Sequence, residues 1–331
     1  MTAKHRPTEF ELIARYFAPL AAGAPGAASL GDDVALVSIG NGEELVLKTD
    51  AIVAGRHFTG EEPAGLIARK LLRVNLSDLA AKGARPIGYL LTAVFPRDIQ
   101  ESWIADFAAG LAEDQWHYGL QLLGGDTTST TGPLTLSLTA LGASARGRTP
   151  RRGDAKSGDA ILVSGTIGDG ALGLDAVRGR LAGLPPPLAQ FLRDRYQLPE
   201  PRLAAGRALV ESGIVQAAMD VSDGLVADLE HICQQSGLGA AIDWDRVPVS
   251  AAARAALDLQ PDLRDRILGG GDDYELLITV ADDDAPRAVE IAHGTGLALT
   301  VIGRMQPGAG VTVRAGDGSA IPLRQKGFQH F

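Results

Sequence analysis

Six short acidic segments recur along the chain, and each adjoins an apolar run. Carboxylate oxygens are the ligands that hard divalent cations such as Mg²⁺ prefer, so aspartates from several segments could hold such ions together. A lone aspartate of this kind is more often a solvated residue at the end of a helix or strand, but six such segments favour a shared cation centre. The segments are Asp32-Asp33, Thr49-Asp50, Asp78, Gly124-Gly125-Asp126-Thr127, Asp220-Val221-Ser222-Asp223 and Gly271-Asp272-Asp273.

Asp78 lies in the segment that organises the first half of the chain. A helix of about five turns is predicted between Pro63 and Gly83, because proline suits a first helical turn and glycine a left-handed residue after the last one. Its apolar residues recur at spacings of three and four, and Asp78 is on the same stripe. Burying an uncompensated carboxylate is costly, so Asp78 must emerge into a cleft or meet a cation.

The other acidic segments are predicted at the ends of strands and at the start of a helix. Thr49-Asp50 lies near the end of a strand that follows an Asn-Gly turn and forms a hairpin with residues 35–39. Residues 120–125 predict a short buried strand that stops at Asp126, where the preceding glycines let the backbone approach a ligand. Asp220-Val221-Ser222-Asp223 precedes a helix over 224–236, with Ser222 or Asp223 as its cap.

Helices and strands are mixed in both halves, which predicts an α+β, mixed α/β protein. The charged, glycine-bearing segment 146–158 is the best candidate for a linker, and we expect domains over 1–147 and 148–331. The other helices are predicted over 8–20, 100–118, 171–181, 187–196, 202–212, 250–257 and 284–293. The other strands are predicted over 87–95, 133–141, 160–165, 215–220, 240–244, 274–280, 298–303, 311–315 and 320–323.

Composition limits the class of protein. The 331 residues are 45% apolar, and 31 Lys and Arg against 40 Asp and Glu give a net charge of −9 without a basic block. This argues against a nucleic-acid surface, although a nucleotide ligand whose charge is carried by metal ions remains open. No apolar run reaches membrane-spanning length, and the single Cys233 reads as a core residue that allows no disulfide within one chain. We expect a cytoplasmic protein.

Two familiar motifs are weak or incomplete in this sequence. Residues 168–173 match G-x-G-x-x-G, but a proline run and a second helix follow where a dinucleotide-binding fold needs its next parallel strand. We favour a glycine turn whose amides meet a nucleotide. A Walker phosphate loop is absent, and Asp220-Val221-Ser222-Asp223-Gly224 lacks the first glycine of a nucleophile elbow, so a serine hydrolase is disfavoured.

Several motifs together resemble the thiamine-monophosphate kinase family of the aminoimidazole-ribonucleotide synthetase superfamily, in the same order from about Phe10 to Phe331. The motifs are ELIARYF, GDDVAL, TDAIVAGRHF, VNLSDLAAKGARP, LLGGDTT, DVSDGLVADLEHI, GGGDDYELL and KGFQHF. The resemblance implies an N-terminal αβ domain that forms a dimeric β-barrel with a second copy, and a C-terminal αβ domain. It also implies that ATP lies in the cleft between the domains.

The resemblance further implies roles for individual positions. The residues implied to hold several Mg²⁺ ions are Asp33, Thr49, Asp50, Asp78, Asp126, Asp220 and Asp223. The residues implied to contact ATP are Gly125, Asp126, Arg152 and Ser222, and those implied to contact thiamine monophosphate are His57, Asp272 and Phe328. The sequence departs from the family pattern at Lys48, whose ammonium can replace or weaken one ion, at Asp272 in place of Glu, and at Gln329 in place of Asp.

The implied reaction is phosphorylation of thiamine monophosphate by ATP to give thiamine diphosphate. Two phosphate groups must approach each other, and two unit charges at about 4 Å repel by about 4 kcal/mol at an effective dielectric constant near 20. Carboxylate-held Mg²⁺ removes this repulsion, and the ionised acceptor needs no general base, so we expect direct in-line transfer with Asp126 as the most critical residue. The alternatives are another ATP-dependent synthetase of the superfamily and a non-catalytic regulatory protein that binds metal and phosphate.

Three implied contacts also have simpler readings. His57 could be a hydrogen-bonded loop histidine, and Arg152 could be one of several solvated linker arginines. Phe328 could pack the end of the chain, although its aromatic face suits the cationic thiazolium ring.

Overall fold

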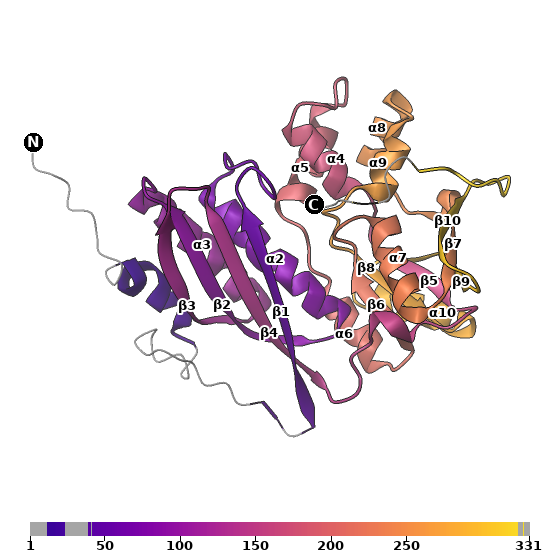
Figure 1. Cartoon of the computed structure of the whole chain (residues 1–331), viewed down its shortest axis with the longest axis horizontal. Helices are drawn as coiled ribbons and strands as arrows, with labels where there is room; N and C mark the ends of the chain where they lie inside the picture. The colour runs from indigo at the N-terminus through magenta and orange to yellow at the C-terminus, as the bar shows by residue number, and fades with distance from the viewer. Residues whose placement is uncertain (1–11, 24–38, 41, 324–326, 328–331) are drawn as a thin grey trace, which may run out of the picture. The chain divides into compact units, whose positions relative to one another are not determined.

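The computed structural model describes residues 12–23, 39–40, 42–323 and 327, and the chain divides into two compact units (Figure 1). The first unit comprises Met1–Leu76 and Arg85–Ala145, and the second comprises Ser77–Ala84 and Arg146–Phe331. The last turn of one helix, α2 (Ala64–Ala81), therefore belongs to the second unit. A functional domain boundary between residues 147 and 148 stays a prediction.

The first unit is built on a four-stranded mixed sheet with the order β1-β4-β2-β3. Its strands are β1 (Glu43–Val53), β2 (Arg85–Pro96), β3 (Gln121–Thr130) and β4 (Thr135–Ala145). β1 and β2 pair antiparallel with β4, whereas β2 and β3 pair in parallel and are joined by α3 (Glu101–Tyr118). A parallel pair requires such a crossover connection. Figure 1 shows α2 and α3 on one side of this sheet.

Alternation of side chains gives the sheet of the first unit two different faces. In β4 the residues Leu136, Leu138 and Ala140 are buried, whereas the residues between them are partly exposed. This period of two confirms the predicted half-buried strand. The other face carries the exposed side chains Leu47 of β1 and Leu90 of β2. We call this second face the open face.

Helix α2 has the predicted length and the predicted end. It spans 18 residues, and Gly83 follows it with a φ of +62°, the left-handed conformation that glycine adopts at low cost. In the first unit the buried Asp114 of α3 accepts hydrogen bonds from Arg73 Nε at 2.7 Å and from Arg69 Nε at 3.0 Å, and both arginines lie on α2. This shared carboxylate fixes α2 against α3.

The second unit is built on a six-stranded sheet with the order β10-β7-β9-β5-β8-β6. Only the β10 and β7 pair is parallel among the pairs of this sheet in the described residues. The strands are β5 (Ala160–Ser164), β6 (Val215–Asp220), β7 (Gly239–Asp243), β8 (Leu276–Val280), β9 (Leu299–Gln306) and β10 (Gly310–Arg314). The helices are α4 (Asp169–Val177), α5 (Pro186–Gln197), α6 (Leu203–Glu211), α7 (Leu225–Ser236), α8 (Ala251–Leu259), α9 (Leu263–Gly269) and α10 (Ala285–Gly294).

Both faces of the second sheet are buried under helices. One apolar core joins strand residues such as Val163 and Met219 to α4, α7 and α9, and contains Cys233. The other core joins Leu162 and Ala218 to α6, α10 and the end of α2. A sheet covered on both faces explains the continuous apolar runs of β5 and β8. The prediction of a mixed α/β fold and the reading of Cys233 as a core residue are confirmed.

Some predicted elements differ from the structure. Within the predicted helix over 8–20, Ile13–Phe17 forms a π-helical turn and Ala18–Ala21 a 3-10 turn, because Pro19 lacks the amide that an α-helix uses there. Helix α9 was not predicted, since it is only seven residues long. Residues 320–323 form only a bridge from Ala320 to Arg314, because Pro322 cannot continue a ladder. The predicted hairpin strand over 35–39 lies mostly outside the described residues.

Candidate functional site

Two acidic segments meet where β6 ends in the second unit. Asp220 is the last residue of β6, is buried, and accepts a hydrogen bond from Ser77 Oγ at 2.6 Å. Ser77 belongs to the last turn of α2, and the half-buried Asp78 is its neighbour in the sequence. The bond from Ser77 therefore brings the end of α2, which carries Asp78, to the end of a strand that carries a second carboxylate.

Two turns lie side by side after Asp220. The amide of Asp272 donates to Ser222 O at 2.9 Å, and the amide of Tyr274 donates to Val221 O at 2.8 Å. A Cβ atom at Gly271 would lie 2.1 Å from Ser222 O, so only glycine allows this approach. These contacts place the predicted residues Ser222 and Asp272 on adjacent backbone segments.

The turn that carries Asp272 is strained. Asp272 has a φ of +72° and Tyr274 a φ of +53°, which are left-handed values that residues with a Cβ rarely adopt. Such conformations cost about 1–3 kcal/mol each and persist only where surrounding contacts hold them. Here the contacts to Ser222 and Val221 hold the turn. Strain of this kind is typical of functional sites.

The buried residue between them, Asp273, has an internal role. Its carboxylate accepts hydrogen bonds from the amides of Gly168 at 2.7 Å and of Gly170 at 2.9 Å. Burial raises the pKa of Asp273 well above its usual range, and the two amides oppose this effect. The prediction that the amides of the glycine turn meet a nucleotide is therefore wrong for Gly168 and Gly170, because a carboxylate of the chain already binds both.

Asp228 caps the start of α7 from inside the helix. Its Oδ2 atom accepts hydrogen bonds from the amides of Ser222, Asp223 and Gly224 at 2.9, 3.0 and 3.1 Å. The residue that precedes α7 is Gly224, with a φ of +124° and no side-chain cap. The prediction that Ser222 or Asp223 caps this helix is wrong, because both lie in the turn before Gly224.

Asp228 also belongs to a group that could hold a cation. Ligand atoms of Asp223, Asp228 and His231 all lie within 4.8 Å of one another. Burial raises the pKa of the Asp228 carboxyl well above its usual range, and the charges of Asp220 and Asp223 raise it further. Sequence reasoning missed Asp228 and His231. The signal that could have found them is the spacing of three between Asp228 and His231, which places both on one face of the predicted helix that follows Asp223.

A further buried carboxylate anchors β8 to two arginines. Glu275 accepts hydrogen bonds from Arg195 at 2.7 Å, from Arg202 Nε at 2.9 Å and from Ser164 Oγ at 2.6 Å. A buried carboxylate needs such cations and donors to offset its lost hydration. Glu275 directly follows Tyr274, so this group fixes the end of the strained turn.

Arg152 belongs to the short 3-10 turn Arg152–Asp154, which lies within the predicted linker over 146–158. Its side chain is exposed, and its carbonyl accepts a hydrogen bond from Ser236 Oγ of α7 at 3.1 Å. Ahead of it, Pro150 O accepts a hydrogen bond from Lys82 Nζ at 3.1 Å. Arg152 thus lies on a segment tied to both α7 and the end of α2.

In the first unit, β3 does not stop at Asp126. The strand runs to Thr130, and Asp126 pairs with Thr92 in the middle of the parallel ladder. The prediction of a strand end at Asp126 is therefore wrong, because the following threonines favour strand continuation. Gly125 has a packing reason of its own, since a Cβ atom there would lie 1.8 Å from Leu91 O.

Register places Asp50 and Asp126 at opposite edges of the same sheet. β1 and β3 are its two outer strands, so three strand spacings, roughly 14 Å, separate them. Asp126 is exposed on the open face, with Thr49, whereas Asp50 alternates to the other face. Lys48 Nζ lies 3.1 Å from Asp50 Oδ1, so these two side chains form an ion pair, and the replacement of a metal ion by Lys48 stays a prediction. Asp50 and Asp126 of one chain cannot bind the same ion.

The other predicted residues lie as follows. His57 follows β1, and its Nδ1 accepts a hydrogen bond from the amide of Val53 at 3.1 Å, so the neutral ring carries its proton on Nε2. Asp33, Phe328 and Gln329 lie outside the described residues.

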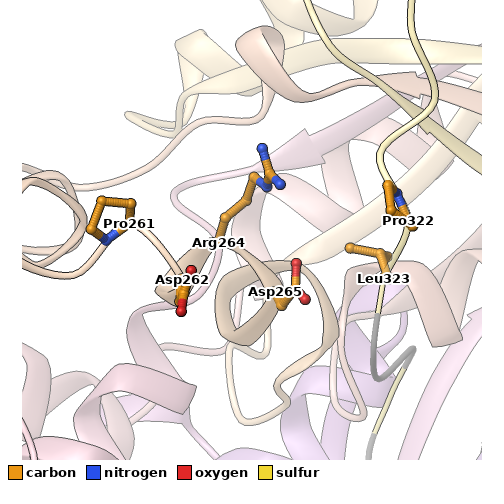
Figure 2. Close-up of a pocket in the computed structure, with 6 residues that line it drawn as sticks. All are labelled: Pro261, Asp262, Arg264, Asp265, Pro322 and Leu323. Carbon is orange, nitrogen blue, oxygen red and sulfur yellow. The ribbon is translucent and has the colours of Figure 1, made fainter.

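The second unit also contains a small cavity of about 280 Å³ that none of the predicted residues lines. Figure 2 shows its six lining residues, which are Pro261, Asp262, Arg264, Asp265, Pro322 and Leu323. The charged groups of α9 and the loop before it form its polar side. No helix in the described part of the chain combines the length and apolar character needed to cross a bilayer.

Comparisons with known proteins agree with the arrangement in two units. The family model described as AIR synthase related protein, N-terminal domain, matches residues 31–144, and the corresponding C-terminal domain matches residues 156–316. The thiamine-monophosphate kinase of Caulobacter vibrioides is 44% identical over 321 residues, which cover 96% of this chain and 90% of the relative.

Solved structures of thiamine-monophosphate kinases are also similar to this chain over most of its length. The thiamine-monophosphate kinase of Stenotrophomonas maltophilia K279a matches with a TM-score of 0.79 at 43% identity, covering 88% of this chain and 91% of the other. AaThiL complexed with AMPPCP and TMP matches with a TM-score of 0.77 at 28% identity, covering 99% of this chain and 100% of the other. This chain belongs to the thiamine-monophosphate kinase family of AIR synthase related proteins.

Proposed function

We propose that this chain phosphorylates thiamine monophosphate with ATP and forms thiamine diphosphate and ADP. The observation that carries the proposal is the nearly full-length similarity to thiamine-monophosphate kinases, including a relative complexed with AMPPCP and TMP. AMPPCP is an analogue of ATP, so the relative binds the two reactants that this reaction needs. The reaction takes place in the cytoplasm, where its co-substrate ATP is available.

The aspartates at the end of α2, at the end of β6 and in the turn after β6 support the proposal that bound Mg²⁺ neutralises the two phosphate groups. Asp78, Asp220 and Asp223 offer only oxygen donors, and hard oxygen donors fit Mg²⁺. Asp220 and Asp223 are separated by one turn that Asp228 fixes through three amides. The chemistry that Mg²⁺ supplies when bound is neutralisation and bridging of phosphate oxygens. These aspartates therefore form the part of the proposed metal site that lies in the second unit.

The proposed transfer is direct and in line. The attacking group is an ionised phosphate, so no side chain has to remove a proton, and alignment of the two phosphates is the main requirement. Ser222 and Arg152 are the proposed contacts to ATP in the second unit, together with Gly125 and Asp126 in the first. No phosphoenzyme forms in this scheme.

Substrate recognition is assigned to His57, Asp272 and Phe328. The neutral ring of His57 has a proton on Nε2, which can donate to a phosphate oxygen. Asp272 is presented on the strained turn beside Ser222. Phe328 would offer an aromatic face to the thiazolium cation. The proposed domains are 1–147, for dimerisation, ATP and metal, and 148–331.

The remaining metal ligands are assigned to the first unit and require a second copy of the chain. Asp33, Thr49, Asp50 and Asp126 are the proposed ligands there, and one chain keeps Asp50 and Asp126 at opposite edges of its sheet. Asp126 shares the open face with Leu47 and Leu90. Pairing of two open faces into a dimeric barrel would cover these leucines and bring each Asp126 next to the partner's sheet.

Release of ADP tests the proposed function directly. The full chain is incubated with ATP and Mg²⁺, with and without thiamine monophosphate, and ADP and thiamine diphosphate are quantified by chromatography. We expect equal amounts of both products, and only when thiamine monophosphate is present. ADP release that depends on another acceptor would indicate a different synthetase of the superfamily. Tight binding of ATP without ADP release would indicate a regulatory protein instead.

A further inference from the structure

Lys82 joins three backbone segments that carry proposed site residues. It follows α2 directly and is partly buried in the second unit. Its Nζ atom donates to Ala218 O at 2.6 Å and to Pro150 O at 3.1 Å. Ala218 lies two residues before Asp220, and Pro150 lies two residues before Arg152. Asp78 lies one helical turn before Lys82 on α2.

The charges around Lys82 are those of the proposed site. The groups that face its ammonium are Asp78 of α2, Asp220 of β6, and Arg152 and Asp154 of the short 3-10 turn. Burial lowers the pKa of Lys82 to about 8, and the Arg152 charge adds to this, whereas Asp220 and Asp78 oppose it. The side chain is therefore still mostly an ammonium at pH 7.

A partly buried lysine has a cost that an apolar residue of similar length would avoid. An ammonium loses hydration on burial. The hydrogen bonds from Lys82 to Pro150 O and Ala218 O go to backbone carbonyls, which carry no full charge to offset this loss. Stability alone thus favours methionine or leucine at this position. An ammonium offers instead three donors, which can bind carbonyls of several segments at once.

We propose that Lys82 is a positioning residue that sets Asp78, Asp220 and Arg152 relative to one another by tying their three segments to one ammonium. This inference rests on the proposed function, because it takes those three residues as ligands of metal and ATP. Lys82 acts through the backbone of β6 and of the linker, not by contact with the reacting phosphates. Loss of the tie displaces Asp220 and Arg152 independently.

The test uses substitutions at position 82 in the full chain. Lys82→Met removes the charge and the donors, Lys82→Gln keeps a donor without the charge, and Lys82→Arg keeps both. Lys156→Met is the matched control, because Lys156 is an exposed lysine of the same unit. The measurements are kcat, KM for ATP and the Mg²⁺ concentration for half-maximal rate at pH 7, together with thermal unfolding of each variant.

We expect Lys82→Met to lower kcat/KM for ATP by about tenfold to 100-fold, the range for misplaced reacting groups. Its unfolding temperature should not fall, and Lys82→Arg should recover most of the lost rate. Lys82→Gln carries the same test if Lys82→Met does not fold.

Three results would overturn the inference. The first is a Lys82→Met rate within about twofold of the wild-type rate, because misplaced reacting groups lower the rate by much more than that. The second is a rate loss matched by lost stability, and the third is a lack of recovery in Lys82→Arg. Each of these results counts against the role of Lys82 only if the wild-type chain forms ADP when thiamine monophosphate is present. Failure of the wild-type chain to do so would instead refute the proposed function.

Discussion

Asp126 is an exposed carboxylate in the middle of β3, so its removal separates function from folding. We expect Asp126→Asn to lower kcat by about 100-fold or more, because a carboxamide lacks the charge that a metal ligand beside the γ-phosphate needs. The unfolding temperature should stay near the wild-type value, since the side chain is exposed and asparagine has the same shape. Both quantities are measured by ADP release and by thermal unfolding.

The control for Asp126 is Thr128→Asn, at the next exposed position on the same face of β3. It tests whether any amide on this face of the strand disturbs the enzyme. Wild-type turnover in Asp126→Asn would remove Asp126 from the site.

The lowered pKa of Lys82 predicts that the free energy of unfolding rises with pH. Its pKa is about 8 in the folded chain and 10.5 in the unfolded chain. Between these values the unfolded chain holds a proton that the folded chain has released, so the free energy of unfolding contributed by Lys82 rises with pH. The stability of the wild type relative to Lys82→Met should increase by up to about 3 kcal/mol from pH 7 to pH 10.5, at about 1.4 kcal/mol per unit.

Urea unfolding of both proteins at pH 7 and above measures this difference. Comparison with Lys82→Met cancels groups common to both, such as Cys233, whose pKa burial raises to about 11. A difference that stays constant or falls with pH would contradict the lowered pKa of Lys82.

At the level of elements, the start of α7 depends on Asp228. We expect Asp228→Ala to lower the free energy of unfolding by about 2–4 kcal/mol, because three amides in and beside the turn lose their common acceptor. Asp228→Asn should recover much of the loss, since its amide oxygen can still accept. Gln234→Ala, at an exposed position of α7, is the control. Chemical unfolding measures all three variants.

The activity of the same variants tests whether Asp228 keeps the turn over residues 222–224 in the shape that the reaction needs. Asp228→Asn should remain more active than Asp228→Ala, because the turn that carries Ser222 and Asp223 keeps its shape. Equal stability of Asp228→Ala and the wild type would show that water replaces the carboxylate at these amides.

Sequence reasoning succeeded for elements whose signals are local. The bounds of α2 follow from proline, glycine and an apolar stripe, and β4 follows from strict alternation of side chains. The expectations that failed concerned partners distant in the sequence. The amides of Gly168 and Gly170 looked available for a phosphate until Asp273, more than 100 residues away, proved to bind them.

The same reason limits the reading of the candidate site. Residue type and motif identified Asp220, Ser222 and Asp272, and the structure places them on neighbouring segments of the second unit. They did not identify Lys82, whose partners are backbone carbonyls that carry no signal in the sequence. They named Asp272 and not Asp273, but gave no sign that Asp273 is buried and bound by two amides.

For the whole molecule, the open face of the first unit has the character of an interface. Leu47 is 62% exposed, Leu90 40% and Leu45 38%, and these leucines lie on one face of a sheet whose other face is buried under helices. Exposed leucines gathered on one face of a sheet are unfavourable in water and are typical of surfaces that bind another protein. A second copy of the same face offers a matching partner, because a twofold interface is self-complementary.

Leu47→Glu tests this arrangement. A charge buried in an apolar interface is strongly unfavourable, so we expect the variant to change from a dimer to a monomer in size-exclusion chromatography with light scattering. Leu259→Glu is the control, since Leu259 is 52% exposed on α8 of the second unit. If Asp126 completes a site that the partner provides, the monomeric variant should also lose turnover while its thermal unfolding stays cooperative. A Leu47→Glu monomer with wild-type turnover would show that one chain contains the whole site, and a wild-type monomer would refute the dimer itself.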